Sequence, residues 1–264
     1  MSIDRRGALR AAAVLAVGVA SSAACDAGGG HQPARGASSP GPPAQPPSPA
    51  QPPSAAPSQG AGGAALPPEV VNGPRDRPNV ALTFHGQGDA AQVRRLLDEL
   101  EHGGARVTVL AVGGWLDAEP AMARRILDGG HELGNHTQNH LAVAKMAAPQ
   151  VFTEINACAD RLKKLTGSIG AWFRPSQTQY STPTIRAQAV KVGYPTCLSY
   201  DLDSLDYTDP GAAAVVHNTL TGVRNGSIVS LHFGHAGTVT ALPEVLDGLR
   251  QRGLKAVTMT ELVT

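Results

Sequence analysis

Gly130-His131-Glu132-Leu133-Gly134-Asn135-His136-Thr137-Gln138-Asn139-His140 is a short strand-like run that leads into two histidines four residues apart. On a helix this spacing places both imidazoles on one face, and on a tight loop it still allows them to converge. Because such pairs are common by chance, the spacing alone is weak support for a metal site. Whether His136 and His140 bind metal depends on what the rest of the chain supplies beside them.

From Glu69 to Thr264, short apolar runs alternate with amphipathic segments over a length sufficient for one domain with a substantial core. Strands are predicted at 79–84, 106–112, 131–135, 171–174, 196–202, 227–233 and 255–260. Helices are predicted at 90–102, 120–128, 149–165, 182–192, 210–222 and 241–252. Because no two strands are joined by a hairpin-length turn, the pattern predicts an α/β fold with about seven parallel strands, and closure into a (β/α) barrel fits it.

Polar side chains with catalytic or metal-binding chemistry follow most of the predicted strands. In parallel α/β folds, such chemistry gathers where strands end and loops begin. In chain order these side chains are His85 to Asp89, His136 and His140, Arg174, Asp203 and Asp206, and His232. We expect His235, on the same loop as His232, to be a solvated surface residue rather than a substrate contact.

The first 24 residues read as an export signal, with a basic head and an apolar run from Ala11 to Ala20 that is too short to span a bilayer. The paired arginines in that head resemble a twin-arginine signal. Ser22-Ala23-Ala24-Cys25 resembles a bacterial lipobox, although it also fits a plain cleavage site. We expect an extracytoplasmic protein, either anchored to the outer face of the membrane by a lipid on Cys25 or secreted.

Residues 25–68 are dominated by Gly, Pro, Ser, Ala and Gln, a composition typical of a disordered linker. Residues 69–264 are then expected to be the catalytic domain. A net charge of +1 gives no electrostatic reason for a nucleic-acid partner, so membrane contact is expected only through the lipid. For Cys158 and Cys197 a disulfide is possible, but we favour unpaired buried thiols.

Five fragments of the domain resemble, in order, the motifs of the polysaccharide deacetylase family, also called the NodB-homology domain or carbohydrate esterase family 4. The fragments are Leu82-Thr83-Phe84, residues 130–140 quoted above, Phe173-Arg174-Pro175, Asp203-Ser204-Leu205-Asp206-Tyr207 and Ser230-Leu231-His232. The resemblance covers nearly all of residues 78–262. It implies a distorted (β/α) barrel that removes acetyl groups from N-acetylated or O-acetylated sugars with a divalent metal, usually zinc.

The resemblance also implies roles for individual residues. His136 and His140 would be metal ligands, and His232 would be the general acid. Asp203 would orient the acid, with Asp206 as the alternative partner.

The first motif departs from the family pattern. Relatives read Thr-Phe-Asp-Asp-Gly, with a base followed by a metal ligand, whereas this chain places His85 and Gly86 at those two positions. In one arrangement Asp89 is the ligand and His85 is the base, which Arg174 would orient. In a second, His85 is the third ligand and Asp89 is the base. In a third, the domain is inactive. We adopt the first arrangement and leave the others open.

The function expected from these residues is hydrolysis of acetyl groups on cell-wall or related polysaccharide, such as peptidoglycan, with zinc as the metal. Two other functions remain open. One is a catalytically impaired domain that binds glycans, and the other is a metal amidohydrolase that acts on a small amide.

Overall fold

The computed structural model describes residues 65–264. The predicted export signal, Cys25 with its lipid, and the predicted linker up to residue 64 lie outside the described residues. Within the described part, no helix combines the length and apolar character needed to cross a membrane.

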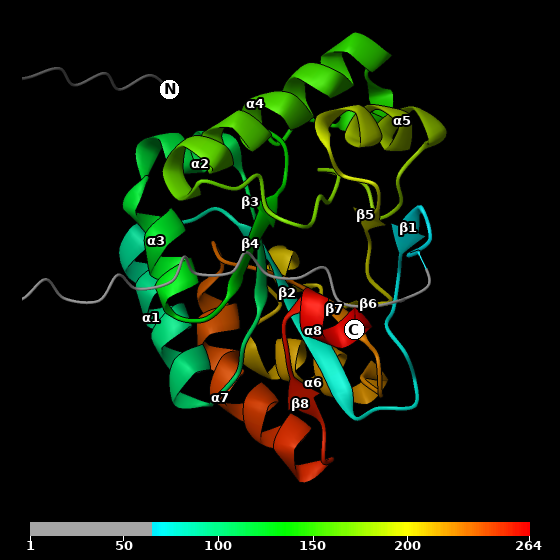
Figure 1. The fold of residues 1–264 in the computed structure, drawn as a ribbon. Helices are drawn as coiled ribbons and strands as arrows, with labels where there is room; N and C mark the ends of the chain where they lie inside the picture. The colour runs from blue at the N-terminus through cyan, green and yellow to red at the C-terminus, as the bar shows by residue number, and fades with distance from the viewer. Residues whose placement is uncertain (1–64) are drawn as a thin grey trace, which may run out of the picture. The chain divides into compact units, whose positions relative to one another are not determined.

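Parallel strands form the centre of the domain (Figure 1). The strands are β1 (Glu69–Val70), β2 (Asn79–Gly86), β3 (Thr108–Ala111), β4 (Glu132–Asn135), β5 (Cys197–Leu198), β6 (Leu202–Asp203), β7 (Ile228–His232) and β8 (Lys255–Ala256). The main sheet has the order β4-β3-β2-β7-β6, with β8 also paired to β2. Single parallel bridges from Asn135 to Phe173 and from Phe173 to Cys197 continue the sheet from β4 towards β5, which pairs with β1.

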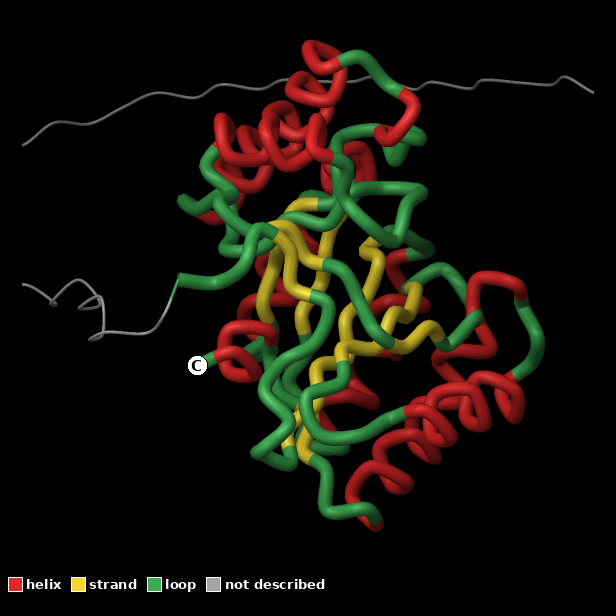
Figure 2. Tube along the Cα trace, turned by 90° about the vertical axis from the view of Figure 1, so that its right-hand side faces the viewer, coloured by secondary structure: helices red, strands yellow, loops and turns green. Residues whose placement is uncertain are grey.

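Helices cover the strands on the outside, as the red helices around the yellow strands show (Figure 2). They are α1 (Ala90–His102), α2 (Gly113–Ala118), α3 (Ala121–Asp128), α4 (Ala148–Thr166), α5 (Pro183–Val192), α6 (Ala212–Gly222), α7 (Ala236–Gln251) and α8 (Met259–Val263), with 3-10 turns η1 (Val143–Lys145) and η2 (Asp206–Thr208). Helix α1 illustrates their packing, because its buried residues Val93, Leu96, Leu97 and Leu100 recur at helical spacing. They pack with side chains of β2, β3 and α7 in the largest apolar cluster.

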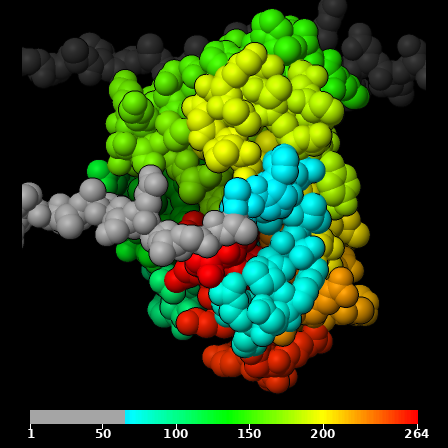
Figure 3. All heavy atoms as spheres, turned by 45° about the vertical axis from the view of Figure 1, so that its right-hand side comes forward, coloured from blue at the N-terminus to red at the C-terminus, as the bar shows by residue number. Residues whose placement is uncertain are grey.

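The start of the described chain lies against the segment that carries α5 and β5, as the cyan and yellow atoms show (Figure 3). This contact follows from the parallel pairing of β1 with β5. Cys158 and Cys197 are buried and do not bond to each other, which confirms the expectation of free thiols.

The prediction of an α/β fold with a parallel sheet is confirmed, and several elements differ from it. The strand predicted at 196–202 is two short strands, β5 and β6, which pair with β1 and β7 respectively, and β1 itself was not predicted. Residues 171–174 form a bridge rather than a strand, and the strand predicted at 255–260 ends at Ala256 because Thr258 caps α8. Helix α7 begins five residues before the predicted 241. Helix α2 was not predicted, because its two opening glycines disfavour a helix.

Candidate functional site

His136 and His140 lie on a tight loop rather than on a helix. His136 follows β4 directly and is fully buried, and His140 has a left-handed backbone with φ of 53°. The two ring centroids are 4.9 Å apart. The loop alternative considered for the HxxxH spacing is therefore the observed one.

Buried Glu154 of α4 holds this loop in shape. Its carboxylate accepts hydrogen bonds from the backbone N–H and the side-chain amide of Asn139, at 2.8 and 2.6 Å. Its backbone carbonyl accepts from the Gln138 N–H at 3.0 Å. Glu154 was missed in the sequence because a glutamate within an amphipathic helix gives no sign that it faces inward.

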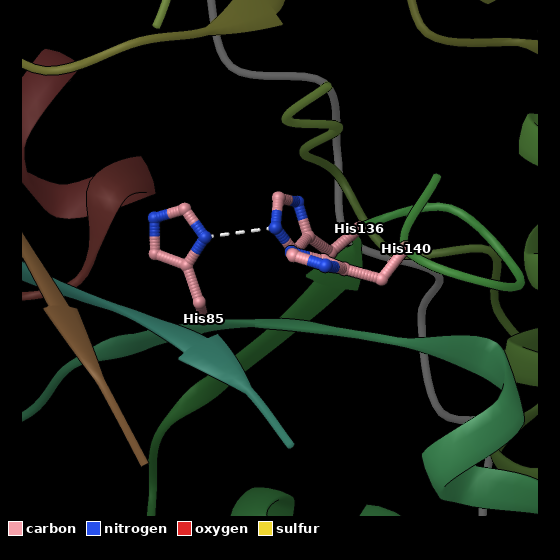
Figure 4. Close-up of side chains that lie close together, drawn as sticks. All are labelled: His85, His136 and His140. Carbon is pink, nitrogen blue, oxygen red and sulfur yellow. Dashed lines mark hydrogen bonds between the residues drawn. The ribbon is translucent and has the colours of Figure 1, made fainter. Parts of the chain in front are cut away.

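His85, at the end of β2, points across the site toward His136 (Figure 4). Its Nδ1 lies 2.8 Å from Nε2 of His136. Its Nε2 lies 3.1 Å from Ser230 Oγ and 3.4 Å from Arg174 Nη1. His85, His136 and His140 form a three-histidine cluster, in which the possible ligand atoms all lie within 4.8 Å of one another.

One backbone contact fixes the tautomers in this cluster. Nδ1 of His136 lies 2.9 Å from the carbonyl oxygen of Arg174 and must donate to it, because a carbonyl only accepts. The lone pair of His136 is then on Nε2, so His85 donates to it from Nδ1. Nε2 of His85 is left as an acceptor for Ser230 and Arg174. A histidine that donates Nδ1–H to a backbone carbonyl and presents Nε2 is the arrangement typical of metal ligands.

All three imidazoles favour the neutral form. Burial, together with the imidazole of His136, holds the pKa of His85 well below its usual 6.5. Burial and the nearby His140 do the same for the pKa of His136. The pKa of His140 is also lowered, by burial and by His232. Neutral imidazoles bind metal without first losing a proton, so the donor set fits a divalent cation.

Arg174 is fully buried behind His85. Its Nη2 donates to Thr83 Oγ1 at 2.8 Å and to the carbonyl of Ser199 at 3.0 Å. Burial lowers the pKa of its guanidinium to about 10, which still leaves the group charged at neutral pH. Arg174 therefore contacts His85, the residue it was expected to orient. Its positive charge opposes proton uptake by the His85 ring, which does not favour His85 as a base.

His232 is held by Asp206. His232 Nδ1 lies 2.7 Å from Asp206 Oδ1, and Asp206 Oδ2 accepts from the His232 backbone N–H and from Thr238 Oγ1, each at 2.7 Å. Burial raises the pKa of Asp206, but the hydrogen bonds from His232 and Thr238 outweigh it and hold the pKa below its ordinary value. Asp206 is therefore the ionised partner that keeps the ring of His232 oriented.

The expectation that Asp203 orients His232 is wrong, because Asp206 is the residue bonded to that ring. Asp203 Oδ1 accepts from the Leu205 N–H at 3.0 Å, and no hydrogen bond joins Asp203 to His232 within residues 65–264. The physical reason is the left-handed backbone of Leu205, with φ of 57°, which starts the 3-10 turn and brings Asp206 inward.

Asp89 does not lie beside the histidines, as it would if it were the metal ligand of the first arrangement. Its Oδ1 accepts from the Gln92 N–H at 2.9 Å and so caps α1, a position in which aspartate is strongly favoured. Among the described residues, the cluster that could hold a metal contains His85 and not Asp89. The geometry therefore matches the second arrangement in its ligands, with His85 as the third.

A hollow of about 410 Å³ opens over this site. Its wall contains the cluster members His85 and His140, together with His232, and is completed by Gln177, Thr178, Gln179, Tyr200, Asp203, Tyr207 and Ser230. Tyr207 is 49% exposed, so it belongs to the wall rather than to the core. The hollow places His85, His140 and His232 within reach of one ligand.

The chain is similar to known polysaccharide deacetylases. A family model described as polysaccharide deacetylase matches residues 72–197. A peptidoglycan-N-acetylglucosamine deacetylase of Bacillus cereus is 29% identical over 194 residues, which cover 72% of this chain and 90% of the relative.

Two solved structures extend the comparison. A family 4 carbohydrate esterase from Streptomyces lividans, in complex with acetate, is 26% identical with a TM-score of 0.63, covering 71% of this chain and 93% of that one. A pseudoenzyme of the same family from Bacillus anthracis has a TM-score of 0.71 at 20% identity, covering 75% and 70%. The second likeness shows the fold alone. The matched motifs, the fold and these relatives together show that the chain belongs to the polysaccharide deacetylase family.

Proposed function

We propose that this domain is a zinc-dependent deacetylase that acts on N-acetylated glycan of the cell wall, with His85, His136 and His140 as metal ligands. The observation that carries the proposal is the convergence of three imidazoles beside an oriented His–Asp pair, with His85, His140 and His232 in the wall of one hollow. The relative from Bacillus cereus, a deacetylase of peptidoglycan, supports the choice of substrate.

A divalent cation bound by the three histidines would polarise the acetyl carbonyl and make a water molecule more acidic. For His85 to ligate through Nδ1, its proton must move to Nε2. Ser230 Oγ, 3.1 Å away, can accept that proton in a hydrogen bond. Arg174 keeps its bonds to Thr83 and Ser199 when it loses the acceptor at His85.

His232 is the group that protonates the leaving amine. Asp206 accepts at Nδ1, so Nε2 is the nitrogen available to give a proton to the amine nitrogen as the carbon–nitrogen bond breaks. Three hydrogen bonds fix the Asp206 carboxylate, so the ring of His232 has one preferred orientation. Tyr207, whose ring centroid is 5.5 Å from that of His232, forms a wall of the acetyl pocket.

We further propose that the protein is exported and tethered to the outer face of the membrane by a lipid on Cys25. The basic head, the short apolar run and the lipobox-like residues support this location. Labelling of cells with a palmitate analogue tests it. Label on the natural protein but not on Cys25→Ser supports the anchor, and equal absence of label from both forms would leave simple secretion.

Metal content and acetate release together test the enzymatic proposal. We expect the protein to bind about one equivalent of zinc, and the double variant His136→Ala/His140→Ala to lose it. We also expect acetate release from an N-acetylated oligosaccharide, which His232→Gln should abolish without loss of zinc. His217→Gln, at an exposed position of α6, is the matched control.

The other outcomes separate the alternatives. Glycan binding with zinc but without acetate release would indicate a pseudoenzyme, and release only from O-acetylated glycan would change the substrate class. Release from small amides alone would indicate an amidohydrolase. Absence of bound zinc would contradict the proposed ligand set.

A further inference from the structure

The proposed reaction needs a base for the attacking water, and neither His85 nor Asp89, the residues first considered for this task, is placed to supply it. Both ring nitrogens of His85 have partners, at Nδ1 and at Nε2. Asp89 caps α1, and Asp206 is buried with three hydrogen-bond donors around it. A general base needs a free lone pair at the reacting atoms. The nitrogens of His85 are engaged, and neither Asp89 nor Asp206 lines the hollow over the site.

A second His–Asp pair lies beside the first. His235 Nδ1 is 2.8 Å from Asp209 Oδ1, and each partner comes three residues after its counterpart in the His232–Asp206 pair. The ring centroids of His235 and His232 are 5.8 Å apart. Because a carboxylate oxygen only accepts, His235 donates from Nδ1, and its lone pair is on Nε2.

His235 reaches the same site from another side. It lines a small hollow of about 80 Å³ together with the cluster members His85 and His140 and with His232. A hollow of this size has room for the attacking water molecule. The side chain of His235 is 24% exposed, so it is in contact with solvent, as expected, and also lines this hollow.

We propose that His235, oriented by Asp209, is the general base of the reaction. The proposal rests on the deacetylase function given above. A water molecule in the small hollow bonds through its oxygen to the acetyl carbon, and one of its protons passes to Nε2 of His235. The carbon–nitrogen bond then breaks as His232 gives its proton to the amine nitrogen, and the acetic acid formed ionises. Exchange with solvent removes the proton from His235 and returns one to His232.

The different exposure of the two carboxylates suits this division of labour. The side chain of Asp206 is fully buried, so its charge acts on His232 with little screening. Asp209 is 72% exposed, so its charge is screened by water and the proton on His235 has a direct route to solvent. Asp206 thus holds the ring of His232 in a contact closed to water, whereas the contact of Asp209 with His235 is open to it.

Steady-state kinetics of His235→Gln and Asp209→Asn test the proposal. We expect kcat of His235→Gln to fall by about 10²–10⁴-fold, the contribution typical of a general base, with KM and bound zinc unchanged. In His235→Gln the rise of kcat with pH should also disappear. Asp209→Asn should lower kcat less and displace that rise, which a purely structural role would not do. His217→Gln again serves as the control.

A second measurement does not depend on turnover. In ¹⁵N NMR spectra of the metal-free protein, neutral His235 should be protonated at Nδ1, and Asp209→Asn should weaken that preference. Full kcat in His235→Gln, or a neutral His235 protonated at Nε2, would overturn the proposal while leaving the deacetylase function intact. Loss of the pH-dependent rise in Asp203→Asn instead would assign the base to Asp203, which lines the larger hollow. Absence of acetate release from the unaltered protein would overturn both proposals.

Discussion

At Gly86 the family resemblance implies a metal-binding aspartate, and the packing around this glycine predicts that no side chain fits there. A Cβ added to Gly86 would lie 2.7 Å from Val109 Cγ1 and 3.0 Å from Ala111 Cα on the neighbouring strand β3. Optimal carbon–carbon contacts are about 3.5–4.0 Å, so β2 and β3 would have to move apart. Gly86 is paired with Ala111 in the sheet and accepts a hydrogen bond from the Val112 N–H at 3.1 Å, so this movement also disturbs the ladder.

We therefore expect Gly86→Ala to lose about 1–3 kcal/mol of stability, the usual cost of overpacking. For a domain of this size, this corresponds to a fall in Tm of between about 2 and 12 °C. Because His85 is the adjacent residue, zinc affinity should also fall, by about 10–100-fold as for other disturbed supporting residues. Differential scanning calorimetry of the metal-free protein and a competitive zinc titration measure the two effects.

Gly237→Ala is the matched control. Gly237 lies in α7, where an added Cβ meets no heavy atom closer than 3.7 Å, so the change should be neutral or stabilise by up to about 1 kcal/mol. If Gly86→Ala were as stable as the natural chain and bound zinc equally well, the packing argument would be refuted. An active, stable Gly86→Asp would refute it more strongly.

Three further predictions concern stability, catalysis and metal affinity. The pKa values of His85 and His136 lie below 6.5 in the metal-free fold, so the unfolded chain binds more protons than the folded chain below that pH. The free energy of unfolding should therefore fall as the pH drops below about 6.5, by up to about 1.4 kcal/mol per pH unit for each histidine. Urea titrations at a series of pH values measure this. Constant stability between pH 7 and 5 would contradict this. Asp206→Asn should lower kcat by about 10²–10⁴-fold without loss of zinc, and a normal kcat would show that the acid needs no ionised partner. Glu154→Gln weakens the hold on Asn139, so zinc affinity should fall by about 10–100-fold in a competitive titration, and unchanged affinity would show that the loop keeps its shape unaided.

The sequence was informative where chemistry depends on the ends of parallel strands. The register of β2 against β7 places His85 opposite His232, and β4 ends at Asn135, just before His136. These side chains meet because the carboxyl ends of neighbouring parallel strands share one edge, which the alternation of strands and helices predicts.

The pairing of side chains within loops was not predictable in the same way. Asp203 and Asp206 both follow the same predicted strand, so the sequence does not show which of them contacts His232. The left-handed turn at Leu205 decides it. The capping role of Asp89 had a recognisable signal, since aspartate before a helical segment favours an N-cap. Helix α8 also had one, in the capping box of Thr258 and Glu261.

The central claim is that three histidines hold the metal, and X-ray absorption at the zinc edge tests it most directly. The zinc-loaded protein should show three imidazole nitrogens at about 2.0–2.1 Å, and His85→Ala should reduce them to two. Two imidazoles with a carboxylate oxygen in the natural protein, unchanged by His85→Ala, would contradict the claim.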